Sequence, residues 1–404
     1  MIRKFITHYK KQLIYSLYAL AIGILIGAID AVFGGILIKI TAFRSNNPQK
    51  LIPFLPFAGI FIIFIYQRFS KESLNGMSLV FKTAHGETDH LPKRLVPLII
   101  ISTWLTHLFG GSAGREGVAV QIGATVSHSI GKKYKVLGNP RALLVIGMAA
   151  GFSGLFQTPL TATFFAIEVL VTGVMMYEVL LPSLVASYAA SMTSHLMGLE
   201  KFSININSSI QLDSTTLIKL ILLGVIFGIV GGTFAILLSY FKGLFSRLFK
   251  HTMLKILVIG CVLSILLLLL HLGRYSGLGT NLISNSFSGG TIFNYDWLLK
   301  LILTLLTLAV GFQGGEVTPL FAIGASLGVV LGGILGLPIM LVAALGYAAV
   351  FGSATNTIIA PILIGVEVFG PQNMIYFAIV CSFAFLFNGN KTIYTMQKRH
   401  DFFA

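Results

Sequence analysis

Apolar residues occupy this chain in long runs that short polar segments interrupt. The runs lie at roughly 13–40, 52–67, 95–110, 118–131, 142–172, 179–197, 216–241, 254–271, 297–312, 319–350 and 357–388. Many are shorter than the about 20 residues that a helix needs to cross a bilayer, or are cut by Gly and Pro. Short and broken helices at matching positions of two halves are typical of membrane transporters, whereas an ordinary bundle shows only uneven hydropathy. The pattern predicts an all-α polytopic membrane protein of tilted and broken helices.

The two halves of the chain resemble one another. Residues 147–152 (GMAAGF) recur at 346–351 (GYAAVF), and Glu168-Val169 recurs as Glu367-Val368, in each case 199 residues later. Residues 122–126 resemble 323–327 at an offset of 201 residues. Several matches in the same order at half the chain length predict a duplication. Whether the two repeats are parallel or inverted is left open by the sequence.

Composition excludes a soluble globular protein. Of the 404 residues, 55% are hydrophobic and 10% are charged, and the mean hydropathy is +0.89. Soluble domains carry about 25% charged residues. In a soluble protein the net charge of +15 would suggest a nucleic-acid partner. In a membrane protein it indicates Lys and Arg in the loops, so we expect no nucleic acid.

Basic residues flank the membrane region at both ends. Four precede the first apolar run and three follow the last, namely Arg3, Lys4, Lys10, Lys11, Lys391, Lys398 and Arg399. By the positive-inside rule both termini are expected in the cytoplasm, with an even number of crossings. The first apolar run is too long for a signal peptide. The two cysteines, Cys261 and Cys381, each lie in an apolar run and are expected to be inert core thiols, and no cofactor is expected.

These features divide the chain into five segments. We expect a basic cytoplasmic N-terminus at 1–12, a first membrane repeat at 13–200, a polar loop at 201–216, a second membrane repeat at 217–390 and a C-terminal segment at 391–404.

One carboxylate stands out because charge is rare in this chain. Glu116 lies in the segment GGSAGREGVAVQIGA, residues 110–124, with glycines on both sides that let backbone approach a bound ion closely. The apolar turns that follow predict a helix that begins near Glu116, and a helix N-terminus attracts anions. A carboxylate placed where an anion binds is a candidate gate. The alternative is an ordinary helix-capping Glu paired with Arg115.

The run Gly114-Arg115-Glu116-Gly117 resembles the signature of the CLC superfamily of anion channels and proton-coupled antiporters. Further family-like segments lie at 151–160, 165–168, 276–283, 314–319 and 391–394, so the resemblance covers most of the chain. It implies the CLC fold with two inverted repeats. It also implies a homodimer with one ion pathway per subunit.

Departures from the family pattern favour one branch. Chloride-type members carry a serine in the first anion loop, where this chain has Met77. The signature closes on Val118 instead of proline, and the second anion loop reads Glu316-Val317-Thr318 instead of Ile-Phe-Ala. The internal proton-relay position holds Val169. This combination is similar to the bacterial fluoride/proton antiporters (CLC-F type). A chloride/proton antiporter with a rerouted proton path, a passive CLC channel and a membrane-embedded enzyme are the alternatives.

The resemblance assigns roles to individual residues. Glu116 would gate the pathway and carry the proton, and Glu316 and Thr318 would relay it. Gly114 and Arg115 would support the loop, and Glu168 and Glu367 are expected to be structural. The anion would meet Met77, Phe81, Gly117, Val118, Val317 and Tyr394. The plainer readings are a packing role for Met77 or Phe81 and a water-facing loop carboxylate for Glu316.

The implied activity is export of fluoride from the cytoplasm in exchange for protons, which would confer fluoride resistance. The expected location is a bacterial cell membrane, and the expected partners are fluoride, protons, the lipid bilayer and a second copy of the chain.

Overall fold

The computed structural model describes residues 2–134, 139–206 and 210–400, and these residues are mostly helical. The first half contains α1 (Ile2–Asn46), α2 (Pro48–Leu51), α3 (Leu55–Phe69), α4 (Gly76–His85), α5 (Leu95–Leu108), α6 (Glu116–Tyr134), α7 (Pro140–Phe156), α8 (Pro159–Glu168) and α9 (Leu180–Leu196). The second half contains α10 (Ser214–Leu248), α11 (Thr252–Leu269), α12 (Thr280–Ser288), α13 (Asp296–Val310), α14 (Val317–Leu335), α15 (Ile339–Thr355), α16 (Ile359–Phe369) and α17 (Met374–Leu386). The prediction of an all-α polytopic fold is confirmed.

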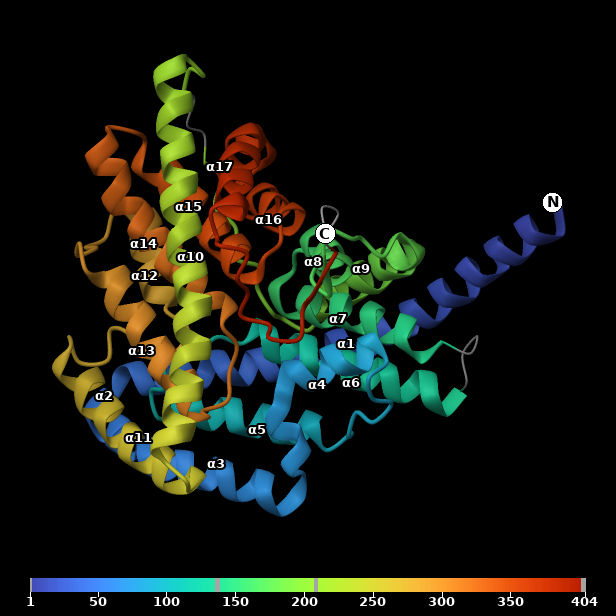
Figure 1. Ribbon diagram of the computed structural model, residues 1–404, viewed down its shortest axis with the longest axis horizontal. Helices are drawn as coiled ribbons and strands as arrows, with labels where there is room; N and C mark the ends of the chain where they lie inside the picture. The colour runs from blue at the N-terminus through green and yellow to red at the C-terminus, as the bar shows by residue number, and fades with distance from the viewer. Residues whose placement is uncertain (1, 135–138, 207–209, 401–404) are drawn as a thin grey trace.

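Five helical segments in the described residues are long and apolar enough to cross a bilayer: Tyr9–Asn46, Pro48–Phe69, Ser214–Leu248, Thr252–Leu269 and Val317–Leu335. The other apolar helices are shorter, as the interrupted hydrophobic pattern predicts. In Figure 1, α10 runs along one side of the molecule, and α1 carries the N-terminus away from the body. The loop predicted at 201–216 includes residues 207–209, which lie outside the described residues, and α10 begins within its last three positions.

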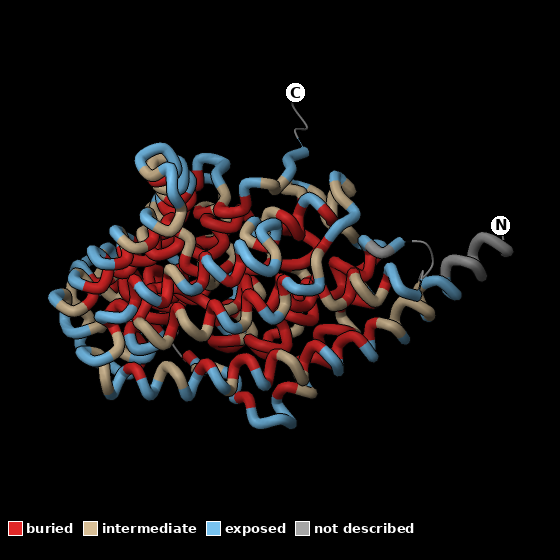
Figure 2. Tube along the Cα trace, turned by 90° about the horizontal axis from the view of Figure 1, so that it is seen from below, coloured by how far each residue is buried: buried red, intermediate tan, exposed pale blue. Residues whose placement is uncertain are grey.

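Many of the exposed residues are large and apolar, among them Ile218 and Ile265. Figure 2 shows exposed residues along the outside of the molecule and buried residues through its interior. In α11 only 28% of an 18-residue apolar stretch is buried, whereas 72% of the corresponding stretch in α14 is buried. Cys261 on α11 is exposed, whereas Cys381 is buried. The prediction that both are core thiols is therefore wrong for Cys261. The reason is that a lipid-facing helix is apolar on its outer side too, so an apolar run does not reveal which face is buried.

Equivalent helix pairs pack in the same way in the two halves. A Cβ atom at Gly123 of α6 would lie 2.0 Å from the carbonyl oxygen of Gly147 in α7. A Cβ atom at Gly324 of α14 would lie 2.0 Å from the carbonyl oxygen of Gly346 in α15. Only glycine lets these backbones approach so closely, which is the small-residue packing that membrane helices use. The duplication found in the sequence is thus repeated in the packing.

Two glutamates bind the halves to each other reciprocally. Glu168, at the end of α8, accepts hydrogen bonds from the backbone N–H groups that begin α16, at Ile358 (2.6 Å), Ile359 and Ala360 (both 3.1 Å). Glu367, near the end of α16, accepts from the N–H groups that begin α8, at Leu160 (3.0 Å) and Thr161 (2.8 Å).

Each of the two helices therefore ends beside the start of the other, so α8 and α16 are antiparallel. Equivalent helices that run in opposite directions are expected of inverted repeats, the alternative that the sequence left open. Both glutamates satisfy helix N-termini that would otherwise be buried without acceptors.

After α17 the chain turns back into the protein. Ile393 donates its N–H to the carbonyl of Ala354 at 2.9 Å. Further along, the short strand β2 (Lys398–Arg399) pairs in parallel with β1 (Val171–Thr172). The segment is therefore anchored both before and after Tyr394. Tyr394 is thereby carried into the interior, where it is 5% exposed.

The reciprocal capping predicts a stability defect. Glu168→Leu leaves the first N–H groups of α16 without an acceptor, so the free energy of unfolding should fall by roughly 1–3 kcal/mol. Thermal or denaturant unfolding of the detergent-purified protein measures this fall. Glu200→Leu, at an exposed position, is the matched control and should unfold like the parent. Equal stability of all three proteins would contradict the capping role.

Candidate functional site

The loops that precede α6 and α14 are joined by backbone hydrogen bonds. Gly114 donates its N–H to the carbonyl of Gly315 at 2.5 Å, and Gly315 donates to the carbonyl of Gly114 at 2.7 Å. A Cβ atom at Gly114 would lie 2.8 Å from Pro319 and 2.9 Å from the Gly315 oxygen, so the bridge requires glycine. It places the N-termini of α6 and α14 side by side.

Glu116 is the first residue of α6 and is fully buried. Its Oε2 accepts a hydrogen bond from the backbone N–H of Thr318 at 3.1 Å and another from the Thr318 hydroxyl. A weaker bond comes from the N–H of Arg115 at 3.3 Å. The carboxylate thus occupies the N-terminus of α14, a position that suits an anion because backbone donors and the helix dipole both favour negative charge.

The Arg115 side chain also lies beside this carboxylate. Its Nε is 3.7 Å from Oε1 of Glu116, and the side chain is 14% exposed. The capping alternative raised from the sequence is therefore partly realised, because Glu116 does approach Arg115. The hydrogen bonds to Thr318 belong to the other repeat, however, and a capping residue within α6 does not require them.

Buried polar groups hold the loop before Glu116. His107 approaches the carbonyls of Thr103 (2.8 Å) and Ala113 (3.0 Å) through its two ring nitrogens. Lys300 of α13 is fully buried and donates to the Ser112 hydroxyl at 2.9 Å. It also donates to the carbonyls of Tyr275 at 3.1 Å and Gly277 at 2.7 Å. These bonds fix the position from which α6 starts.

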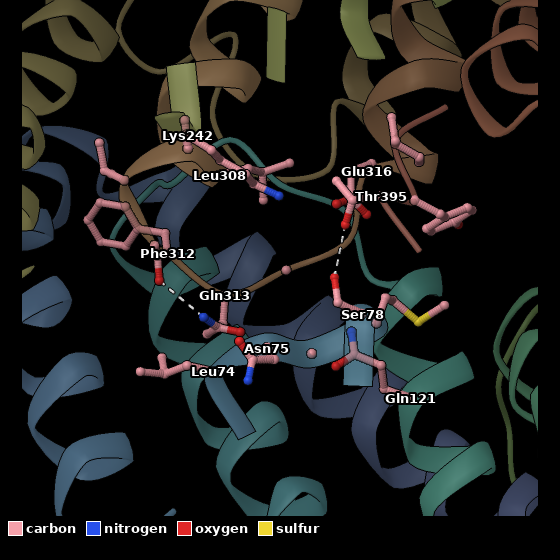
Figure 3. A pocket seen from close by; sticks show the side chains of 18 of the residues that line it. Leu74, Asn75, Ser78, Gln121, Lys242, Leu308, Phe312, Gln313, Glu316 and Thr395 are labelled. Atoms are coloured by element: carbon pink, nitrogen blue, oxygen red, sulfur yellow. Dashed lines mark hydrogen bonds between the residues drawn. The ribbon is translucent and has the colours of Figure 1, made fainter. Parts of the chain in front are cut away.

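A cavity of about 470 Å³ lies next to the two helix starts (Figure 3). Its wall includes four predicted site residues, which are Met77, Phe81, Glu316 and Tyr394. It also includes Asn75, Ser78, Gln121, Lys242, Lys255, Gln313 and Thr395. Glu316, Lys242 and Gln121 come from three different helices or their caps and project toward the same space in Figure 3. The wall mixes polar and apolar side chains and carries two lysines, a combination that can attract an anion.

Met77 lies in the first turn of α4, whose cap residue Asn75 makes no side-chain capping bond. Gly76 begins this helix with φ +46°, a conformation that favours glycine. Met77 is half-buried against the core and also lines the cavity. The ring of Phe81 stacks on that of Tyr394 with centroids 5.1 Å apart. Phe81 is thus both a packing residue and a wall residue.

The structure therefore groups the predicted residues in two adjoining sets. Glu116, Thr318, Gly117, Val118 and Val317 are buried at the two helix starts and are not part of the cavity wall. The second set consists of the four residues of the cavity wall named above. Glu316 connects the two sets, because it is the N-cap residue of α14 and also lines the cavity.

Sequence reasoning did not single out the amides and lysines of the wall. One signal was available for Gln121, which follows Gly117 by four residues and therefore shares its helix face. Lys242 and Lys255 carry no such signal, because α10 and α11 are remote in sequence from the helix starts.

Comparison with known proteins agrees with this architecture. Residues 58–389 match the family described as Voltage gated chloride channel. A relative from Pseudomonas syringae pv. tomato, named a chloride/fluoride channel protein, is 33% identical over 384 residues, covering 93% of this chain and 84% of the relative. The H(+)/Cl(-) exchange transporter ClcA of Yersinia pseudotuberculosis is 28% identical over 360 residues, covering 82% of this chain and 74% of ClcA.

Solved structures are similar over nearly the whole chain. A crystal structure of a CLC-type fluoride/proton antiporter superposes with a TM-score of 0.94 at 52% identity, covering 96% of this chain and 98% of that one. A slow cyanobacterial Cl⁻/H⁺ antiporter superposes with a TM-score of 0.82 at 21% identity, covering 95% and 96%, and supports the fold alone. With its inverted repeats, paired helix starts and buried gate-like carboxylate, this chain belongs to the voltage gated chloride channel (CLC) family of membrane proteins.

Proposed function

We propose that this protein is a secondary active transporter that exports fluoride from the cytoplasm in exchange for protons. The observation that carries the proposal is the Glu116 carboxylate held by the backbone and hydroxyl donors of Thr318 at the start of α14. The similarity to the fluoride/proton antiporter structure supports the choice of substrate.

The geometry suggests how one site exchanges two ions. While Glu116 is charged, it occupies the donors of Thr318. When Glu116 takes up a proton, its attraction to these donors falls and they become free to bind an anion. Fluoride and the Glu116 carboxylate therefore compete for the same N–H and O–H groups, so each fluoride that binds favours protonation of Glu116.

A proton also needs a route from Glu116 to the cavity. Val169, at the position of the usual internal relay, is buried and cannot carry a proton. Glu316 is placed better, because it is two residues from Thr318 and lines the cavity. We therefore assign the relay to Glu316, with Thr318 as the hydroxyl between the two carboxylates.

Fluoride selectivity follows from the donors in the pathway. Fluoride is smaller and more strongly hydrated than chloride, so removing its water requires more hydrogen-bond donors. Thr318 adds a hydroxyl at the helix start, and Met77 replaces the serine of chloride-type members. Amide and hydroxyl groups of the cavity wall offer further polar contacts to an ion that keeps part of its hydration shell.

The proposal extends to the setting of the protein. We place it in a bacterial cell membrane with both termini in the cytoplasm, as a homodimer with one pathway per subunit, where fluoride export would confer fluoride resistance. On this orientation the cavity opens toward the cytoplasm.

Liposome flux tests the activity against its alternatives. Purified protein is reconstituted, and fluoride efflux and lumenal pH are recorded together, with chloride as the comparison ion. Coupled and opposite movement of fluoride and protons is expected. A current that reverses at the fluoride equilibrium potential, independent of the proton gradient, would instead identify a passive channel, the function that the name of the Pseudomonas relative suggests.

Removing the proton carrier should uncouple the exchange. Glu116→Gln keeps the size of the side chain but cannot carry a proton, so proton movement linked to fluoride should be abolished in liposomes. Fluoride transport is expected to fall as well. In the proposed exchange the charged side chain must displace the anion from the donors of Thr318, and an amide competes for them less well than a carboxylate does. Proton-coupled exchange at the parental rate would contradict the assignment of Glu116 as the gate.

Restoring the chloride-type residue should change selectivity. Met77→Ser places a hydroxyl at the start of α4, where the helix has no side-chain cap. The rate of chloride transport relative to fluoride should rise in matched flux measurements. An unchanged ratio would assign Met77 to packing alone.

Replacing the proposed relay should slow exchange without unfolding the protein. Glu316→Gln and Thr318→Val should each reduce fluoride/proton exchange by at least about tenfold, equivalent to about 1.4 kcal/mol in the barrier. Glu200→Gln is the exposed control, and size-exclusion elution identical to the parent establishes folding. Parental exchange by folded Glu316→Gln would require a different proton route.

A further inference from the structure

Gln121 is a buried amide that the mechanism above does not use. It lies one helical turn after Gly117 in α6, is 5% exposed and belongs to the cavity wall (Figure 3). Its Nε2 donates to the carbonyl oxygen of Gly117 at 3.2 Å. Because a carbonyl oxygen only accepts hydrogen bonds, this contact determines the orientation of the amide: the nitrogen faces Gly117 and the oxygen faces away from it.

The Oε1 atom of Gln121 is left without a partner. It is buried and makes no hydrogen bond to the described part of the chain. A Cβ atom at Gly76, at the start of α4, would lie 3.1 Å from this oxygen. A buried acceptor without a donor is unfavourable, so such an oxygen in a cavity wall is suited to bind a molecule that the cavity holds.

The chemistry of the oxygen restricts what that molecule is. A bare fluoride ion has no hydrogen to donate and would be repelled by the carbonyl dipole. Water does donate, and a water between Gln121 and Glu316 can carry a proton. Both side chains line the cavity, and both approach Gly117: Nε2 of Gln121 bonds its carbonyl oxygen, and Oε2 of Glu316 lies 3.5 Å from its Cβ position.

We propose that Gln121 positions the water through which Glu316 exchanges its proton with the cavity. The proposal rests on the fluoride/proton exchange proposed above. The water donates one hydrogen to Oε1 of Gln121 and presents a lone pair to the Glu316 carboxyl. In the export direction the O–H bond of Glu316 breaks, the water gains the proton and passes it to the next cavity water, and Glu316 is left as the carboxylate. Gln121 neither gains nor loses a proton, so it is a positioning residue.

Gln121→Met tests this role, since methionine keeps the length of the side chain and removes the acceptor. No backbone group loses its bond, because the Gly117 carbonyl also accepts the helical N–H of residue 121. Gln372→Met is the matched control. Gln372 is an amide outside the cavity wall, and its Nε2 likewise donates to a backbone carbonyl, that of Ile206 at 3.2 Å.

We expect Gln121→Met to exchange fluoride for protons at least about tenfold more slowly than the parent near neutral pH. The deficit should shrink to about threefold or less when the cavity side is alkaline, because hydroxide or buffer base then takes the proton from Glu316 without a well-placed relay water. The titratable groups that line the cavity, Glu316, Lys242, Lys255 and Tyr394, are present in both proteins, so they do not produce this difference. Gln372→Met should keep the parental rate and pH profile.

The outcomes separate this proposal from the proposed function. If the parent shows no fluoride-linked proton movement, both are wrong. If the parent exchanges fluoride for protons and Gln121→Met has the parental rate and pH profile, only the role of Gln121 is wrong. A deficit of equal size at every pH also overturns that role, since a loss of packing alone predicts that result. Gln121→Asn, which withdraws the acceptor by one methylene and keeps an amide, should show the same pH-dependent deficit. A parental profile for this variant contradicts the proposal even where Gln121→Met does not fold.

Discussion

The structure of the ion site depends on one contact between the repeats, the pair of backbone hydrogen bonds that joins Gly114 to Gly315. These bonds bring two helix N-termini from opposite halves into a single place, so that two sets of unsatisfied N–H donors face a common region. A membrane offers no water to satisfy them. The site therefore demands an anion or a carboxylate, and Glu116 supplies the carboxylate.

The same physical demand explains the other acidic residues at helix starts. Glu168 and Glu367 satisfy the N-termini of α16 and α8, as Glu116 satisfies that of α14. The first two bind several backbone donors each and belong to a reciprocal pair, which suits a permanent structural contact. Glu116 accepts from a single residue of α14, Thr318, and has no reciprocal partner of this kind. The reciprocal pair joins two helices from both ends, whereas Glu116 joins α6 to α14 at one end only.

Lysines and amides, by contrast, gather in the cavity wall. Under the proposed function, Lys242 and Lys255 would attract anions toward the wall, and the amides and hydroxyls would offer contacts that do not hold an ion too tightly to leave. Glu316 lies between the buried helix starts and this cavity. In the proposed relay, the proton would reach the cavity through Glu316 without passing the position of Val169.

Local sequence patterns determined much of this protein. Hydrophobic runs and scarce charge were enough to predict an all-α membrane fold, because the bilayer permits few alternatives. The apolar turns that follow Glu116 placed it at a helix start, because the boundary of a helix is marked by residues close by in the sequence. Sequence could not decide the inversion of the repeats, the exposure of Cys261, the bond between Glu116 and Thr318 across 202 positions, or the unpartnered oxygen of Gln121. These four features depend on which helices pack against each other. An apolar pattern does not specify the neighbouring helix; close contacts at glycines and hydrogen bonds between backbone donors and buried carboxylates do.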